Sequence, residues 1–362
     1  MSDTVATTPE VDALLSQNAP VAIGVSGGKD SSAVAFATVA HLDRIGHCGE
    51  RLLIHSDLGA TEWRDSLPWC HKLASRLGLE LVVVRRAKGD MMDRWEQRWS
   101  DNCRRYVELS CVQLILPWST PGMRFCTSEM KTSVICRELT DRFPGQTIIS
   151  VTGIRRDESR GRQNAPIYKP QPKLTSKTRQ TTGIDWHPIA HWPLKQVFAY
   201  LQDQDFPLHP AYAQWGMSRV SCAFCIMSSM RDIAASVRCP DNHDLYRRMV
   251  ALELRSTFAF QGDKWLADVA PELLSSADAV RIPFTKLAAK HRQESEALVP
   301  RHLLYTKGWP TCIPTETEAE LLCQVRMRVA GIVGLEIGYT STSSLISRYR
   351  ALYEQKHGEG GK

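Results

Sequence analysis

The chain has 362 residues, 43% of them hydrophobic and 23% charged, which is typical of a globular protein with one large or two smaller domains. Its apolar runs are shorter than the roughly 20 residues that span a bilayer, and its first residues show no signal sequence. We therefore expect a cytoplasmic protein with no membrane partner. The formal net charge of +6 permits a polyanionic partner without requiring one. Eleven cysteines in a reducing compartment are expected to be thiols, metal ligands or redox groups.

The first elements of the chain have the order of an anion-binding site. Residues 20–25 are an apolar run of strand length, residues 26–31 a small polar turn, and residues 33–42 an alanine-rich stretch at helical spacing. A glycine turn between a strand and a helix lets backbone N–H groups point at a phosphate. The turn lacks the Walker spacing, and the plain alternative is a glycine turn with no ligand. It reads Ser26-Gly27-Gly28-Lys29-Asp30-Ser31.

Further strands alternate with helices along the first part of the chain. Residues 51–57 and 79–84 are predicted strands, and residues 61–77 between them have helical periodicity. This alternation predicts an α/β fold with a doubly wound parallel sheet, whose ligands bind at the carboxyl ends of the strands. Ser56 and Asp57 would then lie at the same edge as the glycine turn. Asp57 suits a nucleotide ribose or base, and capping of the next helix is the alternative.

Two more segments bring basic residues to this edge. Residues 90–116 are predicted to be helical, residues 124–131 form a loop that leads into a helix through Leu139, and residues 147–152 form another strand. That strand ends at Arg155 and Arg156. Guanidinium groups are permanently charged and bind phosphates in bidentate geometry. The alternative is that Arg155 and Arg156 are an ordinary pair of solvated surface arginines.

The remainder of the chain divides into a basic loop and a helical region. Residues 160–184 contain six basic residues, three prolines and no acidic residue, which indicates a mobile loop. It would contact a phosphate backbone or be plain solvated surface. After a helix at 194–201, helical stretches are predicted at 243–260, 284–298, 316–333 and 343–353. We expect a nucleotide-binding domain at 1–221 and a cysteine-containing helical region at 222–362.

Four blocks in one order resemble a known family. They are 26–31, 124–131, 153–159, and 187–192 continuing through His209-Pro210 to Cys222-Ala-Phe-Cys225. Together they resemble the phosphoadenosine phosphosulfate reductase family over roughly residues 20–240. Within it they look like the sulfurtransferase branch that includes the ATP pyrophosphatase subunit of DNA phosphorothioation systems. The resemblance implies an adenine-nucleotide alpha-hydrolase-like fold and ATP as ligand.

The resemblance also implies roles for individual residues. Ser26, Gly27, Gly28, Asp30 and Ser31 would hold the pyrophosphate, with Lys29 nearby. Asp30 would also help to place Mg²⁺, which prefers hard oxygen ligands. Nucleotide contacts from other loops would come from Arg124, Lys131, Gly153, Arg155 and Arg156. The groups expected to act in catalysis are Lys29, Asp30 and Arg155.

The cysteines distinguish the branches of this family. The sulfonucleotide reductases use a cysteine in a C-terminal Glu-Cys-Gly motif, or a Cys-Cys pair with a later Cys-x-x-Cys, and neither pattern occurs here. Reductase chemistry would therefore lack its expected thiolate nucleophile. Four thiolates can instead hold a 4Fe–4S cluster, as in the phosphorothioation relatives, or zinc. A redox pair and small buried hydrophobes are the alternatives. The candidate ligands are Cys126, Cys222, Cys225 and Cys239.

These patterns predict an ATP pyrophosphatase that adenylates an acceptor oxygen for sulfur insertion. Sulfur would come through a cysteine or cluster from a partner cysteine desulfurase, and the acceptor would be DNA or tRNA, with other modification-system subunits as partners. A sulfonucleotide reductase and a non-catalytic nucleotide-binding scaffold are the alternative functions. The histidines near the predicted edge are expected to make structural hydrogen bonds. They are His55, His187, His191 and His209.

Overall fold

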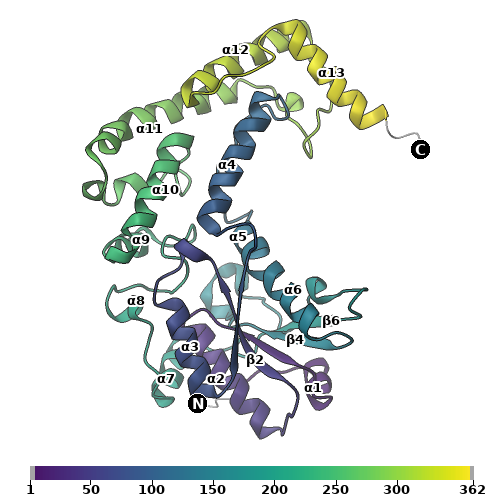
Figure 1. Cartoon of the computed structure of the whole chain (residues 1–362), viewed down its shortest axis with the longest axis vertical. Coiled ribbons are helices and arrows are strands. Elements are labelled where there is room, and N and C mark those ends of the chain that lie inside the picture. Colours follow the sequence, from purple (N-terminus) through teal and green to yellow (C-terminus); the bar gives the residue numbers. More distant parts are fainter. Residues whose placement is uncertain (1–4, 359–362) are drawn as a thin grey trace. The chain divides into compact units, whose positions relative to one another are not determined.

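The computed structural model describes residues 5–358, and the chain divides into two compact units (Figure 1). The first unit comprises residues 1–91 and 121–243, and the second comprises 92–120 and 244–362. This division differs from the expected boundary between residues 221 and 222. In the second unit Trp95 and Trp118 pack edge to face with each other at 5.4 Å and with Phe260 at 6.4 and 5.3 Å. These aromatic contacts join segment 92–120, which interrupts the first unit in sequence, to Phe260, a residue far along the chain in an irregular segment.

The first unit is built on a six-stranded sheet in the order β3-β2-β1-β4-β6-β5 (Figure 1). All neighbours are parallel except β5, which is antiparallel to β6. The predicted α/β fold is confirmed. The strand order reverses beside β1, so the gap between the ends of β1 and β4 is the switch point where such sheets bind ligands. The strands are β1 (Val21–Gly24), β2 (Arg51–Asp57), β3 (Glu80–Arg85), β4 (Thr147–Val151), β5 (Tyr168–Pro170) and β6 (Thr182–Trp186).

Strand β5 and the first three residues of β6 lie in the segment 160–184 that was predicted to be a mobile loop, so that prediction was wrong for these residues. Strand β6 has only two large apolar residues, Ile184 and Trp186, and β5 ends in a proline. Neither segment therefore has a strong strand pattern of its own. Strand β6 forms because it pairs with β4 and buries Trp186 completely, and such pairing overrides intrinsic propensity.

Helices cover both faces of the sheet. Alternate strand residues face opposite sides, so Ile23 packs with α1, α2, α3 and α7, whereas Leu52 and Ile148 pack with α6. Helix α3 begins five residues later than predicted, because a 3-10 turn occupies 59–61. The helices of this unit are α1 (Pro9–Ser16), α2 (Lys29–Arg44), α3 (Ser66–Leu77), α5 (Phe125–Thr127), α6 (Ser133–Arg142), α7 (Leu194–Asp203), α8 (Pro210–Ala213) and α9 (Met230–Val237).

The second unit is helical, as predicted. Helix α4 ends nine residues before the expected end at Leu116. Helix α11 starts eight residues before the expected start, because Ser275 accepts the Asp278 N–H at 3.1 Å and caps it. Within residues 5–358, none of the helices combines the length and apolarity that crossing a bilayer requires. The long helices are α4 (Met91–Val107), α10 (His243–Ser256), α11 (Ser276–Ala297), α12 (Glu316–Val333) and α13 (Thr342–Gly358).

Candidate functional site

The glycine turn 26–31 joins β1 to α2 at the carboxyl edge of the sheet, as the sequence predicts. Gly27 has φ +75°, a left-handed conformation that favours glycine, and a Cβ there would lie 3.0 Å from the His209 ring. The Ser31 hydroxyl donates to Gly28 O at 2.8 Å and accepts the Ser26 N–H at 3.2 Å. The turn is therefore held in shape by its own side chains and by His209.

The chain just beyond the end of β4 approaches the start of α2 very closely. A Cβ on Gly153 would lie 2.6 Å from Asp30 O and 3.2 Å from Ser31 N, which are backbone atoms of the first turn of α2. Only glycine fits at this distance. Gly153 therefore serves to let the chain that leads to Arg155 pass beside the glycine turn.

A cavity of ≈ 340 Å³ opens at this switch point. Its polar groups include the ammonium of Lys29 and the guanidinium of Arg155, and its backbone includes the start of α2, whose N–H groups favour anions. Two groups of residues that were expected to act together, the turn and Arg155, are thus brought to one cavity. The lining residues are Ser26, Gly28, Lys29, Asp30, Ser31, Arg155, Asp157, Glu158, Leu194, Tyr212, Ser218, Arg219 and Val220.

Of the three basic residues that line the cavity, Lys29 and Arg155 are engaged by protein acceptors. Arg155 is 3% exposed, and it donates to Asp30 at 2.6 Å, to Asp157 at 3.0 Å and to Trp192 O at 3.3 Å. Lys29 is 6% exposed, and its Nζ lies 3.4 Å from Asp30 Oδ2. Asp30 therefore bridges both cations, and a ligand phosphate would compete with its carboxylate for them.

Sequence reasoning missed the segment that closes the other side of the cavity. The Tyr212 hydroxyl accepts the Lys29 N–H at 3.2 Å and the Val220 N–H at 3.1 Å. Residues 206–212 show no charge or glycine pattern that would indicate a binding segment. The only feature of the sequence that pointed to them was the short distance from His209-Pro210 to Cys222. Tyr212, Ser218, Arg219 and Val220 join the site through tertiary contacts alone.

Several predicted nucleotide-binding residues are held by protein partners elsewhere in the first unit. Ser56 is buried and donates to Met130 O, and Asp57 accepts from Gly59 N at 2.7 Å and pairs with Arg85. Arg156 donates to Ala165 O at 2.9 Å, and it lies 3.2 Å from the His191 ring. Arg124 is exposed at the start of α5, and Lys131 is half-buried in the turn before α6.

Two of the candidate cysteine ligands, Cys225 and Cys126, act electrostatically on a third, Cys222. Burial raises the pKa of Cys222 to about 12, the positive charge of Lys131 opposes this, and Cys225 and Cys126 add to the rise. Cys222 is therefore a protonated thiol at neutral pH, the less reactive form. Burial also raises the pKa of Cys239, where the charges that act are those of Asp241 and Asp65. All eleven cysteines lie within the described residues, and none of them forms a disulfide.

The arrangement of these thiols does not match a preformed metal centre. Over residues 5–358, no group of three or more Cys, His, Asp or Glu side chains is arranged to hold a metal ion. We therefore assign no step to a cluster or to zinc. The 4Fe–4S cluster with Cys126, Cys222, Cys225 and Cys239 as ligands stays a prediction.

The histidines make the structural hydrogen bonds that were predicted. Burial opposes the charge on His55, but hydrogen bonds to Cys70 and Glu62 raise its pKa to about 10. Its ring also lies 3.0 Å from Val25 O, directly before the glycine turn. Burial lowers the pKa of His209 to about 4, so its neutral ring accepts the Ala211 N–H at 3.0 Å.

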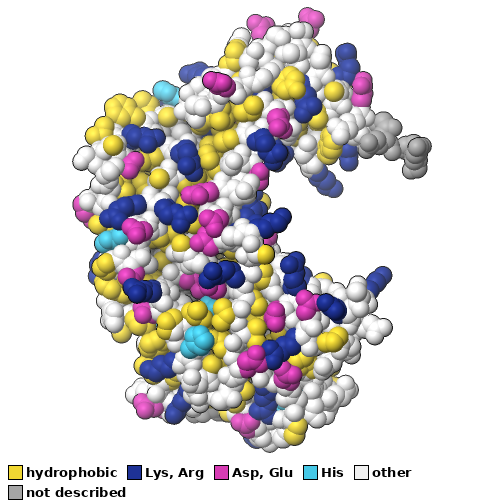
Figure 2. Space-filling view, viewed as in Figure 1, with side chains coloured by type: hydrophobic (Ala, Val, Ile, Leu, Met, Phe, Trp, Pro, Cys, Tyr) yellow, Lys and Arg dark blue, Asp and Glu magenta, His cyan; other side chains and the backbone are white. Residues whose placement is uncertain are grey.

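The basic segment 160–184 is largely paired within the protein. Arg162 pairs with Glu158, Lys169 lies 3.2 Å from Asp185, and Arg179 lies 2.8 Å from Asp141. Lys173 donates to Ser128 O at 3.0 Å and to the Ser133 hydroxyl at 2.8 Å. Figure 2 shows basic and acidic side chains interspersed over the visible face. A nucleic-acid backbone would have to compete with these pairs.

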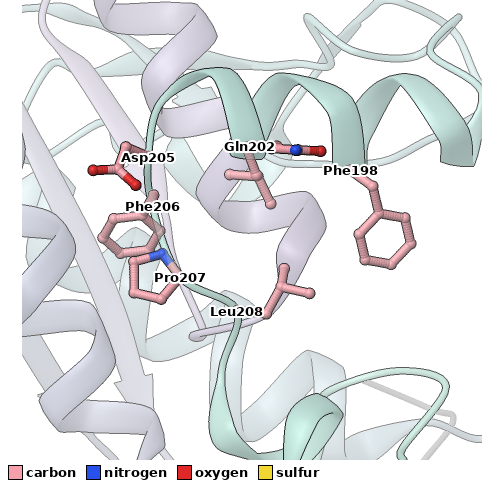
Figure 3. A pocket seen from close by; sticks show the side chains of 7 residues that line it. Phe198, Gln202, Asp205, Phe206, Pro207 and Leu208 are labelled. Carbon is pink, nitrogen blue, oxygen red and sulfur yellow. The ribbon is translucent and has the colours of Figure 1, made fainter.

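A second cavity of the first unit, of ≈ 560 Å³, lies at the end of α7 (Figure 3). Figure 3 shows Phe206, Pro207 and Leu208 in the segment that follows the helix. This cavity is lined mainly by apolar side chains and contains no Lys or Arg among its described lining residues, which run from Phe198 to Leu208. An anionic ligand is therefore better placed in the cavity at the glycine turn.

Comparison with known families agrees with this site. Residues 20–228, more than half of the chain, match the model of the phosphoadenosine phosphosulfate reductase domain. The chain belongs to this family. The match covers every residue that lines the cavity at the glycine turn. A family of nucleotide-binding α/β enzymes is thereby established for the chain, and the closer resemblance to phosphorothioation sulfurtransferases stays a prediction.

Solved structures add a more distant likeness. The chain is similar to the crystal structure of phosphoadenylyl-sulfate reductase from Candida auris in a phosphate complex, with 14% sequence identity and a TM-score of 0.36. The similarity covers 60% of this chain and 97% of that chain. No curated protein matches the sequence.

Proposed function

We propose that this member of the phosphoadenosine phosphosulfate reductase family is a cytoplasmic ATP pyrophosphatase that activates an acceptor for sulfur transfer. ATP would place its phosphates against the turn 26–31, an acceptor oxygen would attack the α-phosphate, and pyrophosphate would leave. The observation that carries the proposal is the cavity that combines the start of α2 with Lys29 and Arg155. Preorganised N–H groups and cations stabilise the charge that develops on phosphoryl oxygens.

Asp30 is central to how this site would work. Its carboxylate bridges Lys29 and Arg155, so both cations are held at the cavity before a ligand arrives. Mg²⁺, held by phosphate oxygens and by Asp30, would supply further neutralisation of charge. The phosphates would take over Lys29 and Arg155 from Asp30, which frees its oxygens for this role.

The thiols support the sulfur-transfer half of the proposal. Cys126, Cys222 and Cys225 share one electrostatic environment with Lys131, and the backbone N–H of Ala223 between the last two donates to Thr61 O at 2.8 Å. A thiol of this group would receive sulfur as a persulfide from a cysteine desulfurase. The outer persulfide sulfur would then displace AMP from the adenylated acceptor, which leaves the acceptor joined to the cysteine through an S–S bond. A second thiol of the group would attack the cysteine sulfur, release the thiolated acceptor and form a cysteine disulfide, which an external dithiol would reduce. We propose DNA or tRNA as the acceptor, and other subunits of a modification system as partners.

Pyrophosphate release from ATP tests the proposal. The full chain, purified without oxygen, is assayed with Mg²⁺ and with DNA or tRNA in turn. Arg155→Ala should lower the rate by about 10²–10³, the usual cost of removing a group that stabilises developing charge. Arg142→Ala is the matched control, because Arg142 also bridges two carboxylates, Glu50 and Glu80, outside the cavity. No pyrophosphate release by the wild-type chain under any of these conditions would refute the proposal.

A sulfonucleotide reductase is the second candidate, because the family model that matches is that of the phosphoadenosine phosphosulfate reductase domain. Phosphoadenosine phosphosulfate and reduced thioredoxin replace ATP in the assay, and sulfite is measured. Sulfite formation without pyrophosphate release from ATP would favour the reductase. Tight ATP binding with neither product would indicate a nucleotide-binding scaffold subunit.

A further inference from the structure

Tyr212 joins two parts of the first unit that are remote in sequence. Its hydroxyl accepts one backbone N–H from Lys29, the first residue of α2, and a second from Val220. A Cβ on Gly28 would lie 3.5 Å from Val220 O and 3.7 Å from the same hydroxyl. The hydroxyl oxygen therefore lies against the glycine turn and accepts from the start of α2, where an N–H group would otherwise be available to a phosphate oxygen.

The neighbouring residues hold the side chain of Lys29 as well. Lys29 Nζ lies 3.5 Å from Ser218 O and 5.4 Å from the centre of the Tyr212 ring. We call residues 212–220 the strap. Both the backbone and the ammonium of Lys29 are thus engaged by the strap, and the lysine is 6% exposed.

The strap is anchored at its far end and leads directly to the thiols. Asp232, which is 2% exposed, accepts from Ser218 N at 2.8 Å and from the Ser218 hydroxyl at 2.7 Å. Val220 precedes Cys222 by two residues. A change in the hydrogen bond between Tyr212 and Val220 is therefore transmitted to the segment that carries Cys222 and Cys225.

We propose that Tyr212 is a positioning residue that reports phosphate occupancy of the glycine turn to the cysteines. The inference rests on the proposed binding of phosphate at this turn. A phosphate oxygen that accepts the Lys29 N–H takes the place of the Tyr212 hydroxyl. The same hydroxyl then leaves Val220 N, because both bonds depend on one oxygen position. Cys222 and Cys225 are only partly exposed in this structure, and release of the strap makes them more accessible to a sulfur donor when the nucleotide is bound.

Tyr212→Phe separates this role from simple packing, because it removes the hydroxyl and keeps the ring. In the empty variant the Lys29 N–H loses its acceptor, so inorganic pyrophosphate should bind about five-fold more tightly than to the wild type, the factor expected for one net hydrogen bond. Tyr168→Phe removes a tyrosine hydroxyl from β5 of the same unit and should leave the affinity unchanged. Calorimetry on the full chain measures both.

The second readout is the alkylation of Cys222 and Cys225 by iodoacetamide, followed by mass spectrometry. In the wild type, saturating pyrophosphate should raise the rate several-fold, and Tyr212→Phe should show the raised rate without pyrophosphate. Should Tyr212→Phe fail to fold, Asp232→Asn loosens the strap at its other anchor and should raise the rate in the same way. A variant rate that stays low and still responds to pyrophosphate, or unchanged pyrophosphate affinity, would overturn the inference.

The two proposals can fail separately. Failure to release pyrophosphate from ATP, together with the expected effects of Tyr212→Phe on pyrophosphate binding, would remove the proposed function and leave the role of Tyr212 intact. Pyrophosphate release from ATP, together with a Tyr212→Phe variant that behaves as the wild type, would remove the role of Tyr212 and leave the proposed function intact. Inorganic pyrophosphate is the probe because it contacts the turn without depending on the identity of the nucleotide.

Discussion

Gly153→Ala should disable the site without touching any charged group. The added Cβ would lie 2.6 Å from Asp30 O, whereas ordinary van der Waals contact begins at 3.4 Å. The backbone at Gly153, just after β4, must therefore separate from that of α2 by about 0.8 Å, the difference between these distances. Overpacking of this kind costs about 1–3 kcal/mol of stability. Because the displaced atoms belong to the first turn of α2, we expect about a 100-fold loss of ATP turnover, typical of a 1 Å misplacement.

Gly161→Ala is the matched control, because a Cβ at Gly161 would meet no atom within 4 Å and Gly161 lies in the same loop region after β4. Urea unfolding gives the stability of both variants, and calorimetry with inorganic pyrophosphate gives the state of the turn. We expect Gly153→Ala to lose both stability and affinity while Gly161→Ala keeps both. Wild-type stability and affinity in Gly153→Ala would show that the segment after β4 does not constrain the start of α2 as described.

Three further predictions follow from buried charges. Arg155→Ala should lower the free energy of unfolding by about 3 kcal/mol, because two carboxylates lose a buried partner. Arg142 is more exposed, so Arg142→Ala should cost about 1 kcal/mol or less in the same denaturation assay. The pKa of His55 is raised to about 10 in the folded protein, so the stabilisation that its charge gives the fold is complete below the unfolded pKa near 6.5 and is lost as the pH rises through 10. The free energy of unfolding measured across pH 6–10 should show this fall, and Glu62→Gln should make the pH dependence flatter. Glu253 in the helical unit accepts three buried N–H groups, from Phe260, Leu266 and Ala267, so Glu253→Ala should cost at least about 3 kcal/mol in calorimetric unfolding, and a smaller loss would mean that water replaces the carboxylate.

The parts of the site that could be predicted from the sequence are those built from consecutive residues. The turn 26–31 is held by bonds between Ser26, Gly28 and Ser31, so its geometry is a property of the local sequence. Helices such as α2 and α12 were found because their apolar residues recur at helical spacing. Arg155 was placed correctly because it follows a strand whose carboxyl end must reach the same edge of the sheet.

The remainder depends on contacts between distant residues, and no local pattern encodes these. Strand β6 forms by pairing with β4, and segment 92–120 joins the second unit through Trp95 and Trp118. The Tyr212 hydroxyl accepts the Lys29 N–H from a residue 183 positions away in sequence, and neither residue type indicates this hydrogen bond. The sequence alone determined a glycine turn at the carboxyl edge of a parallel sheet. Tertiary structure decided what covers that turn, because a hydrogen bond between remote segments exists only once both have packed against the same sheet.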